Sequence, residues 1–212
     1  MWTASTIKLA MAADLLERHR AGSITLDATA RKQIADMLDF SSNSAANQLW
    51  KNFRLADRVA HYRSAYGMAG LGFPTGDRYW GAMKCTTLDL LSLMSYVLDS
   101  LPAPDRDFIV DAMRSVSPIQ QWGVWAAGPR LAPGVKGGWS IEKDPGGEHW
   151  VANSVGFAGP DARYVIATMY QLPPGVLTKA GTIDAGVHAV SDIVATIFGA
   201  RVPAPVTIPQ DP

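Results

Sequence analysis

The chain has 212 residues, 48% of them apolar, and its 19 Lys and Arg residues balance its 19 Asp and Glu residues. This size and composition suit one globular domain, and the lack of net charge gives no field that would attract nucleic acid or an anionic membrane surface. A lone cysteine, Cys85, excludes an internal disulfide. No stretch reaches the length of apolar sequence that a transmembrane helix needs. We expect one domain over residues 1–200 and a proline-rich tail over residues 201–212.

Apolar residues recur at helical spacing through the first half of the chain. This periodicity predicts helices over residues 5–19, 27–38, 44–50, 55–66, 87–99 and 105–116. Between the fourth and fifth of these helices, residues 67–85 contain five glycines and Pro74. That composition predicts an irregular loop, long enough to suggest a functional role.

The second half of the chain changes period. Residues 134–141, 150–157 and 163–170 are predicted strands, because they are separated by the turn sequences Asp-Pro-Gly-Gly at 144–147 and Gly-Pro-Asp-Ala at 159–162. A last helix is predicted over residues 182–198. Helices around three consecutive antiparallel strands make an α+β fold.

The first candidate site is Ser5-Thr6-Ile7-Lys8. A spacing of three on a helix puts Ser5 and Lys8 on one face, where the amine could take the hydroxyl proton. The lysine can be that base at neutral pH only if burial or a second cation lowers its pKa. The same spacing in Ser140-Ile141-Glu142-Lys143, just before a turn, shows that chance also supplies this motif.

Two further segments carry polar residues. Ser41-Ser42-Asn43 precedes a predicted helix, and Lys136-Gly137-Gly138-Trp139 lies on the first predicted strand. Each also has a purely structural interpretation, the first as an interhelical turn with an N-cap and the second as an edge-strand lysine followed by glycines.

In this order the three segments resemble the signature of the class A serine β-lactamases and related penicillin-binding proteins, which is Ser-x-x-Lys, then Ser-Asp-Asn, then Lys-Thr-Gly. Residues 40–50, 86–88 and 150–164 are similar to further segments of that family. The resemblance runs from Ser5 to about Gly199. It implies a serine β-lactamase-like α+β fold, with a helical subdomain in the middle of the chain and without the family's N-terminal strands.

The resemblance also implies roles for single residues. Ser5 would be the nucleophile, Lys8 its base, and Ser41 the donor of a proton to the leaving nitrogen. Lys136 would recognise a substrate carboxylate, and Asn43 would hold a substrate amide. We expect the two lysine amines to converge on the Ser5 hydroxyl.

The strand after the third motif would complete the substrate site. Gly138 and Trp139 would contact the substrate, and the backbone N–H groups of Ser5 and Trp139 would form an oxyanion hole. Such donors stabilise charge where it develops during acyl transfer. Trp80 and Trp139 are expected to line the pocket if the motifs assemble.

The sequence departs from the family pattern at three places. Ser42 stands where the family has aspartate, and Gly137 stands where it has a threonine or serine hydroxyl. Residues 73–85 contain no glutamate, whereas class A enzymes use one in this loop to activate the deacylating water. The loop's one acid, Asp77, is interpreted as a turn residue. We therefore expect acylation by penicillins without efficient turnover.

The front of the chain departs as well. Four residues precede Ser5, and Ser41 follows it after 36 positions, a shorter spacing than the family's. A sheet of three strands would leave an exposed edge. We expect a second copy of the chain, in a homodimer, or the proline-rich tail to cover that edge.

The predicted function is therefore that of a serine hydrolase or acyltransferase acting on peptidoglycan-like D-Ala peptides, β-lactams or esters. No cofactor is implied, and His19, His61, His149 and His188 lack the spacing of a metal site. The alternative is a catalytically inactive protein of the same fold that binds or scaffolds, which the missing loop glutamate favours. The resemblance implies export to the cell envelope, but no leader is visible in the sequence, so a cytoplasmic location stays open.

Overall fold

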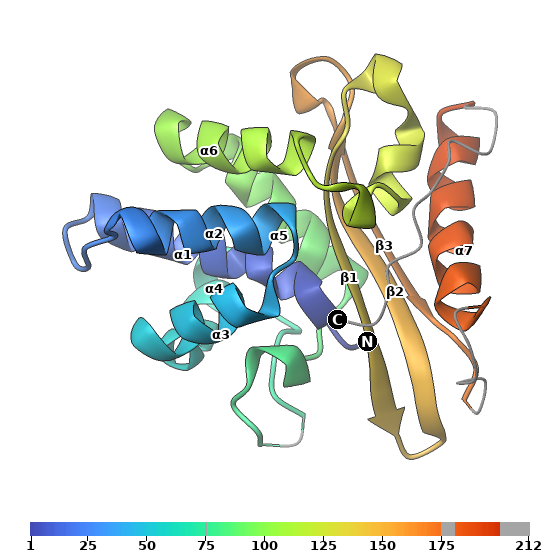
Figure 1. The fold of residues 1–212 in the computed structure, drawn as a ribbon, viewed down its shortest axis with the longest axis horizontal. Helices are drawn as coiled ribbons and strands as arrows, with labels where there is room; N and C mark the ends of the chain where they lie inside the picture. Colours follow the sequence, from blue (N-terminus) through green and yellow to red (C-terminus); the bar gives the residue numbers. More distant parts are fainter. Residues whose placement is uncertain (75, 175–180, 200–212) are drawn as a thin grey trace.

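The computed structural model describes residues 1–74, 76–174 and 181–199, so the predicted tail over 201–212 lies outside the described residues. One antiparallel sheet, in the order β1-β2-β3, contains the strands β1 (Gly134–Asp144), β2 (Gly147–Ala158) and β3 (Tyr164–Gln171). Helix α7 (Gly181–Ile197) covers one face of this sheet, and the other helices lie against the opposite face (Figure 1). This arrangement is the predicted α+β fold.

Strands β1 and β2 are longer than the sequence pattern predicts. Their pairing runs from Gly134 opposite Phe157 to Asp144 opposite Gly147. The turn therefore consists of Pro145 and Gly146 alone, because the ladder continues to the residues that flank them. Strand β3 pairs with β2 from Tyr164 to Gln171.

The helices agree closely with those predicted, and capping side chains explain several of their starts. Asp27 accepts a hydrogen bond from the Ala30 N–H, and Thr86 forms a capping box with Asp89. The helices on this side of the sheet are α1 (Lys8–Arg20), α2 (Ala28–Asp39), α3 (Asn43–Asn52), α4 (Val59–Ala65), α5 (Thr87–Asp99) and α6 (Ala103–Arg114).

Helix α1 is the buried centre of the helical part. Every residue from Lys8 to Leu16 is buried, and its apolar side chains share one core cluster with side chains of α2, α5 and β2. A helix that is apolar on all sides must be enclosed in this way. The start of α1, which carries the first motif, is therefore held firmly against the sheet.

Residues 1–7 differ from the prediction, which placed Ser5 on an α-helix. Ala4–Ile7 form a 3-10 turn, and α1 begins only at Lys8. The turn is closed by the Thr3 carbonyl, which accepts hydrogen bonds from the N–H and the hydroxyl of Thr6. Ser5 still lies at the N-terminal end of the helix.

The segment between α6 and β1 contains structure that the sequence pattern did not predict. It forms three 3-10 turns, Pro118–Gln120, Gly123–Ala127 and Pro129–Leu131. Prolines and glycines at their boundaries keep each turn short. These turns bring Gln120 and Trp122 beside the third motif.

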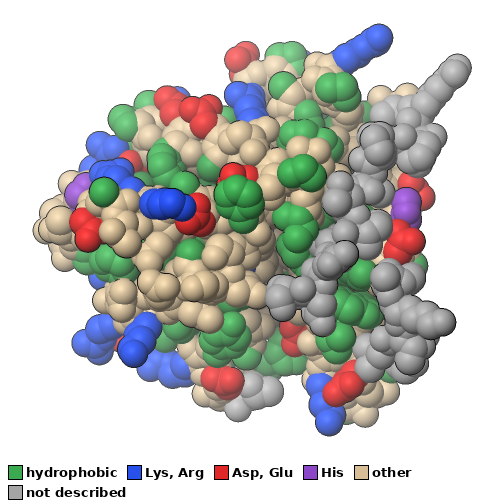
Figure 2. Space-filling model, viewed as in Figure 1, with side chains coloured by type: hydrophobic (Ala, Val, Ile, Leu, Met, Phe, Trp, Pro, Cys, Tyr) green, Lys and Arg blue, Asp and Glu red, His purple; other side chains and the backbone are tan. Residues whose placement is uncertain are grey.

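The loop over residues 67–85 is irregular, as predicted, apart from the turn Trp80–Ala82. Backbone bridges from Lys84 to Trp2 and Gly72 tie it to the N-terminus. On the face of the molecule in Figure 2, acidic and basic side chains are mixed. Within the described part of the chain, no helix has both the length and the apolar character needed to cross a membrane.

Candidate active site

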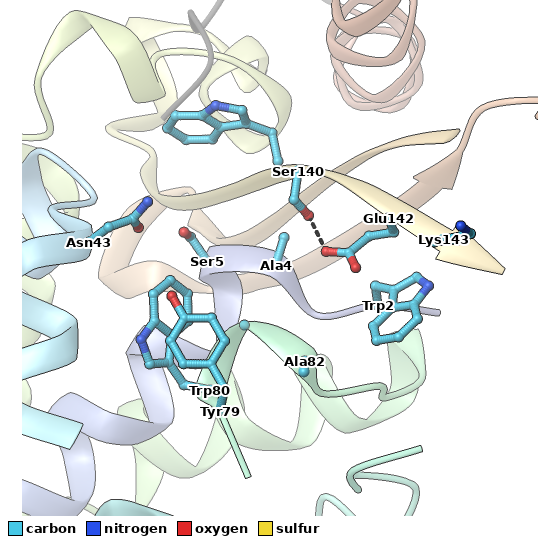
Figure 3. Close-up of a pocket in the computed structure, with 12 residues that line it drawn as sticks. Trp2, Ala4, Ser5, Asn43, Tyr79, Trp80, Ala82, Ser140, Glu142 and Lys143 are labelled. Atoms are coloured by element: carbon cyan, nitrogen blue, oxygen red, sulfur yellow. Dashed lines mark hydrogen bonds between the residues drawn. The ribbon is translucent and has the colours of Figure 1, made fainter. Parts of the chain in front are cut away.

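Ser5 lies at the wall of a cavity of about 540 Å³ between the N-terminal turn, the loop before α5 and strand β1. Its neighbour Ala4 has a positive φ of 46°. Left-handed backbone at a non-glycine residue costs of the order of 1–3 kcal/mol and is common at functional sites. Ser5 is 7% exposed, and its side chain faces the cavity across from Asn43 (Figure 3).

Lys8, one turn along the chain, is fully buried beneath the cavity. Its Nζ donates to Asn43 Oδ1 at 2.6 Å, to the Ser41 carbonyl at 2.7 Å and to Ser41 Oγ at 3.3 Å. The amine also lies 4.5 Å from the centre of the Trp80 ring. Burial lowers the pKa of Lys8 from 10.5 to about 7, so a large fraction of this amine is neutral at neutral pH.

Lys136 approaches the second motif from the other side. Its Nζ donates to Ser41 Oγ at 3.0 Å and to the Gly137 carbonyl at 2.7 Å. Burial and, secondly, the charge of Lys8 lower the pKa of Lys136 well below 10.5. Lys136 does lie on an edge strand, since β1 is at one end of the sheet, but its side chain is fully buried and does not face solvent.

The two amines do converge on one hydroxyl, but it is that of Ser41 and not that of Ser5. Among the described residues, none forms a hydrogen bond with the Ser5 hydroxyl, while Lys8 is drawn to the carbonyl oxygens of Ser41 and Asn43. The expectation of a direct contact to Ser5 is therefore wrong for this structure. Ser41 has a positive φ of 56°, which turns its carbonyl and hydroxyl toward the lysines.

Ser42 has the structural role that the N-cap interpretation gave to this segment. Its hydroxyl accepts the Ala45 N–H at 3.2 Å at the start of α3. Ser42 therefore caps α3 while its neighbours Ser41 and Asn43 bind Lys8. The second motif is both a turn and part of the site.

Gln120 is the residue of the site that sequence reasoning missed. Its Oε1 accepts hydrogen bonds from Lys136 Nζ at 2.5 Å and from the Gly137 N–H at 3.1 Å. Its Nε2 donates to the carbonyls of Leu38 at 2.6 Å and Asp39 at 2.5 Å. One buried amide thus joins the end of α2 to strand β1. No motif includes Gln120. The only signal in the sequence is that a polar residue follows Pro118 and Ile119 in a turn.

Both glycines of the third motif are explained by their neighbours. A Cβ on Gly138 would lie 3.0 Å from the backbone N of Ser5 and 2.8 Å from that of Thr6, so β1 passes directly beside the turn that carries Ser5. A Cβ on Gly137 would lie 2.8 Å from the Trp122 ring. Trp122 therefore fills the space that a threonine or serine side chain would need at position 137.

Other predicted residues lie as follows. Trp80 and Trp139 both line the cavity, and Trp139 packs edge-on against Trp122 at a centroid distance of 6.1 Å. Asp77 is exposed and accepts the Tyr79 N–H at 3.1 Å, the contact of a turn residue. Lys136 is not among the residues that line the cavity.

The second Ser-x-x-Lys sequence cannot reproduce the first. Ser140 and Lys143 lie on strand β1, where positions three apart point to opposite faces. The Ser140 hydroxyl donates to Glu142 Oε1 at 2.6 Å. Over residues 1–74, 76–174 and 181–199, no three His, Cys, Asp or Glu side chains gather as metal ligands would.

Solved structures of β-lactamases resemble the chain over most of its length. A class A β-lactamase from Bacteroides cellulosilyticus matches with a TM-score of 0.71 at 16% identity, covering 94% of this chain and 84% of that chain. A β-lactamase from Xanthomonas campestris pv. campestris matches at 0.68 and 18% identity, covering 92% and 83%. The chain has the class A β-lactamase fold. Identity this low shows the fold alone.

The chain is also similar in sequence to a protein found in two mycobacteria. The "Putative lipoprotein LppW" of Mycobacterium tuberculosis is 26% identical in an alignment of 195 residues that covers 88% of this chain. The chain spans 61% of the length of that relative, and the same holds for the protein of that name in Mycobacterium bovis. No family model matches the chain. One residue from each of the three sequence segments lines the cavity, namely Ser5, Asn43 and Trp139.

Proposed function

We propose that the chain is a serine acyltransferase or hydrolase in which Ser5 forms an acyl intermediate with D-Ala peptides, β-lactams or esters. The observation that carries the proposal is the buried arrangement of Lys8, Ser41 and Lys136 directly behind a serine at the wall of a cavity. Buried amines with lowered pKa values are bases at neutral pH.

The proposed proton path follows the contacts. Neutral Lys8 takes the Ser5 proton as Ser5 Oγ attacks the substrate carbonyl, after the lysine side chain moves within reach of that hydroxyl. The proton then passes from Lys8 to Ser41, to which its Nζ is already bonded at 3.3 Å, and on to the leaving nitrogen. The N–H groups of Ser5 and Trp139 stabilise the tetrahedral oxyanion. Asn43, which lines the cavity, holds the substrate amide, and Gly138 keeps strand β1 close to the turn that carries Ser5. Lys136 is fully buried and does not line the cavity, so its proposed role is to hold Ser41.

Release of the acyl group is proposed to be slow. The loop over residues 73–85 supplies no glutamate, and its Asp77 is an exposed turn residue. Class A enzymes place a glutamate in this loop to activate the deacylating water. Labelling by a penicillin should therefore be faster than its hydrolysis.

Incubation with a fluorescent penicillin, followed by mass spectrometry of the labelled peptide, tests the proposal. We expect one adduct on Ser5, none in Ser5→Ala, and labelling slowed by about 10²-fold or more in Lys8→Met. Ser140→Ala is the matched control, because Ser140 lines the same cavity and begins the second Ser-x-x-Lys sequence. It should be labelled at the wild-type rate.

An adduct on Ser140, or none on Ser5 after hours, would contradict the proposal. The second result favours the alternative of a non-catalytic binding module. That alternative has one structural observation in its favour, the Ser5 hydroxyl without a hydrogen bond in the described part of the chain.

We further propose that the protein acts in the cell envelope on peptidoglycan-like substrates. The support is the mycobacterial relative, which is named a lipoprotein. Cell fractionation with an antibody to the chain tests this, and recovery only with cytosolic markers would contradict it.

We also propose that a second copy covers the outer edge of β3. Among the described residues this strand pairs with β2 alone, and Tyr164 and Tyr170 on it are 42% and 37% exposed. Open edges are templates for strand pairing. Sedimentation velocity should find a dimer, and a monomer at all concentrations would contradict the proposal.

A further inference from the structure

The cavity beside Ser5 has a second polar end that the proposed chemistry does not use. Ser5 and Asn43 lie at one end, and Glu142 lies at the other, next to Trp2 (Figure 3). Glu142 is on the same face of β1 as Lys136, because side chains two positions apart on a strand share a face. The strand thus carries an amine behind Ser41 and a carboxylate at the far end of the cavity.

The Glu142 carboxylate has no basic partner. Its hydrogen bond comes from the Ser140 hydroxyl, and no ion pair among the described residues includes it. The basic groups whose charges act on it, Lys84 and His149, both bond instead to Asp144, at 2.6 and 2.9 Å. Partial burial raises the pKa of Glu142, which is the mark of a carboxylate that lacks a compensating cation.

Aromatic rings form much of the wall of this cavity, with Trp2 next to Glu142 and Tyr79 and Trp80 nearer Ser5 (Figure 3). Trp2, Tyr79, Trp80 and Trp139 all line the cavity, and the Tyr79 and Trp80 rings pack together at a centroid distance of 5.0 Å. Two of these rings already hold an amine, because the Nζ of Lys84 lies 4.3 Å from the Trp2 centroid and that of Lys8 lies 4.5 Å from the Trp80 centroid. Aromatic faces together with a carboxylate are the surroundings in which proteins bind ammonium groups.

Two lysines lie near this end of the cavity. Lys84 is paired with Asp144 at 2.6 Å. Lys143 lines the cavity, is exposed, and forms no ion pair with any described residue. An exposed lysine is well solvated, so it opposes a bound cation less than the half-buried Glu142 attracts one.

We propose that this cavity selects substrates whose acyl portion ends in a positively charged amine, held by Glu142 and the surrounding aromatic rings. The inference deepens the proposed function and depends on it for the position of the reacting carbonyl. The N–H of Trp139 is proposed to bind that carbonyl, and Glu142 lies three residues further along, or about 10 Å along a strand. The glutamate side chain shortens this distance, so a short aminoacyl chain reaches it.

Binding to the Ser5→Ala variant tests the proposal without any chemistry. The probes are 4-aminobutanoyl-D-Ala-D-Ala and pentanoyl-D-Ala-D-Ala, which have the same length and differ in an ammonium against a methyl group. Calorimetry should give about tenfold tighter binding of the amine, a difference of about 1.4 kcal/mol. In Ser5→Ala/Glu142→Gln the two peptides should bind equally, and in Ser5→Ala/Lys143→Gln the preference should persist or grow.

Equal binding of the two peptides, or a preference that survives Glu142→Gln, would overturn the proposal. In the protein that keeps Ser5, a Glu142→Gln variant that retains the preference but no longer releases its acyl group would also overturn it, because Glu142 would then act as a water-activating base. Glu142 is half-buried and glutamine has its shape, so circular dichroism should confirm an unchanged fold. A binding preference without acylation of wild-type Ser5 would refute only the proposed function, and acylation without any preference would refute only this inference.

Discussion

Replacing Gln120 with leucine tests whether this amide joins the two parts of the site. Gln120 bonds four buried groups, the carbonyls of Leu38 and Asp39, the Gly137 N–H and Lys136 Nζ. The Asp39 carbonyl keeps hydrogen bonds from Ser117, and Lys136 keeps those to Ser41 and Gly137. The substitution therefore leaves two groups without a partner, the Leu38 carbonyl and the Gly137 N–H.

Each such group costs about 1–3 kcal/mol, so Gln120→Leu should lower the free energy of unfolding by about 2–6 kcal/mol. Urea denaturation measures the change. Gln121→Leu is the control, because Gln121 makes one side-chain hydrogen bond, to the Val116 carbonyl at 3.1 Å, and should cost about 1 kcal/mol. A loss in Gln120→Leu no larger than that of Gln121→Leu would refute the reasoning.

Three further predictions concern the backbone, the base and the hairpin. Gly138→Ala should slow acylation by about 10²-fold, because the added Cβ would lie 3.0 Å from the backbone N of Ser5, whose N–H is proposed to belong to the oxyanion hole. Gly146→Ala, at the hairpin tip, should leave the rate unchanged. Equal rates of penicillin labelling in the two variants would contradict this. The acylation rate should rise with pH and be half-maximal near the Lys8 pKa of about 7, since only the neutral amine accepts a proton; a flat stopped-flow profile around that pH would exclude Lys8 as the base. The hydrogen bond from Lys84, the largest cause, lowers the pKa of Asp144 from 3.8 to about 2, so its ionised form stabilises the fold above that range and the benefit is lost as the pH falls from 3.8 toward 2. Asp144→Asn should therefore be less stable than wild type at neutral pH, with the difference in urea midpoint shrinking through that interval.

Local sequence signals were sufficient for most of the fold. Apolar spacing and capping residues located the helices to within a few residues, as at Thr86 and α5, and turn sequences separated the three strands. The 3-10 turn at Ser5 was missed because the pattern of apolar residues in α1 continues into it. Distinguishing a 3-10 turn from an α-helix depended on the contact of Thr6 with the Thr3 carbonyl, which no spacing reveals.

The motifs predicted which residues of the site come together but not how they bond. Lys8, Ser41, Asn43 and Lys136 meet as expected, yet the shared hydroxyl is that of Ser41. Carbonyl oxygens of the second motif attract Lys8 more strongly than a hydroxyl does, and this competition depends on the left-handed backbone of Ser41. The role of Gln120 could not be predicted from the sequence for a related reason, since its partners include backbone groups from distant segments.

The replacement of the usual hydroxyl residue by Gly137 shows how a departure from a motif can be compensated in space. From the sequence, the missing hydroxyl could only be counted as a loss. In the structure the Trp122 ring occupies that position and also packs against Trp139, which lines the cavity. The site therefore exchanges a polar contact for an aromatic wall, in keeping with the other aromatic rings that line the cavity.

Burying two amines beside one hydroxyl is costly, because each must leave water and each disfavours the charge of the other. Three acceptor oxygens around Lys8 and three around Lys136 offset part of this cost. What is not offset appears as the lowered pKa of Lys8, and a base is most effective when its pKa lies near the working pH. The burial that weakens the fold at this point is thus the same property on which the proposed proton transfer from Ser5 to Lys8 depends.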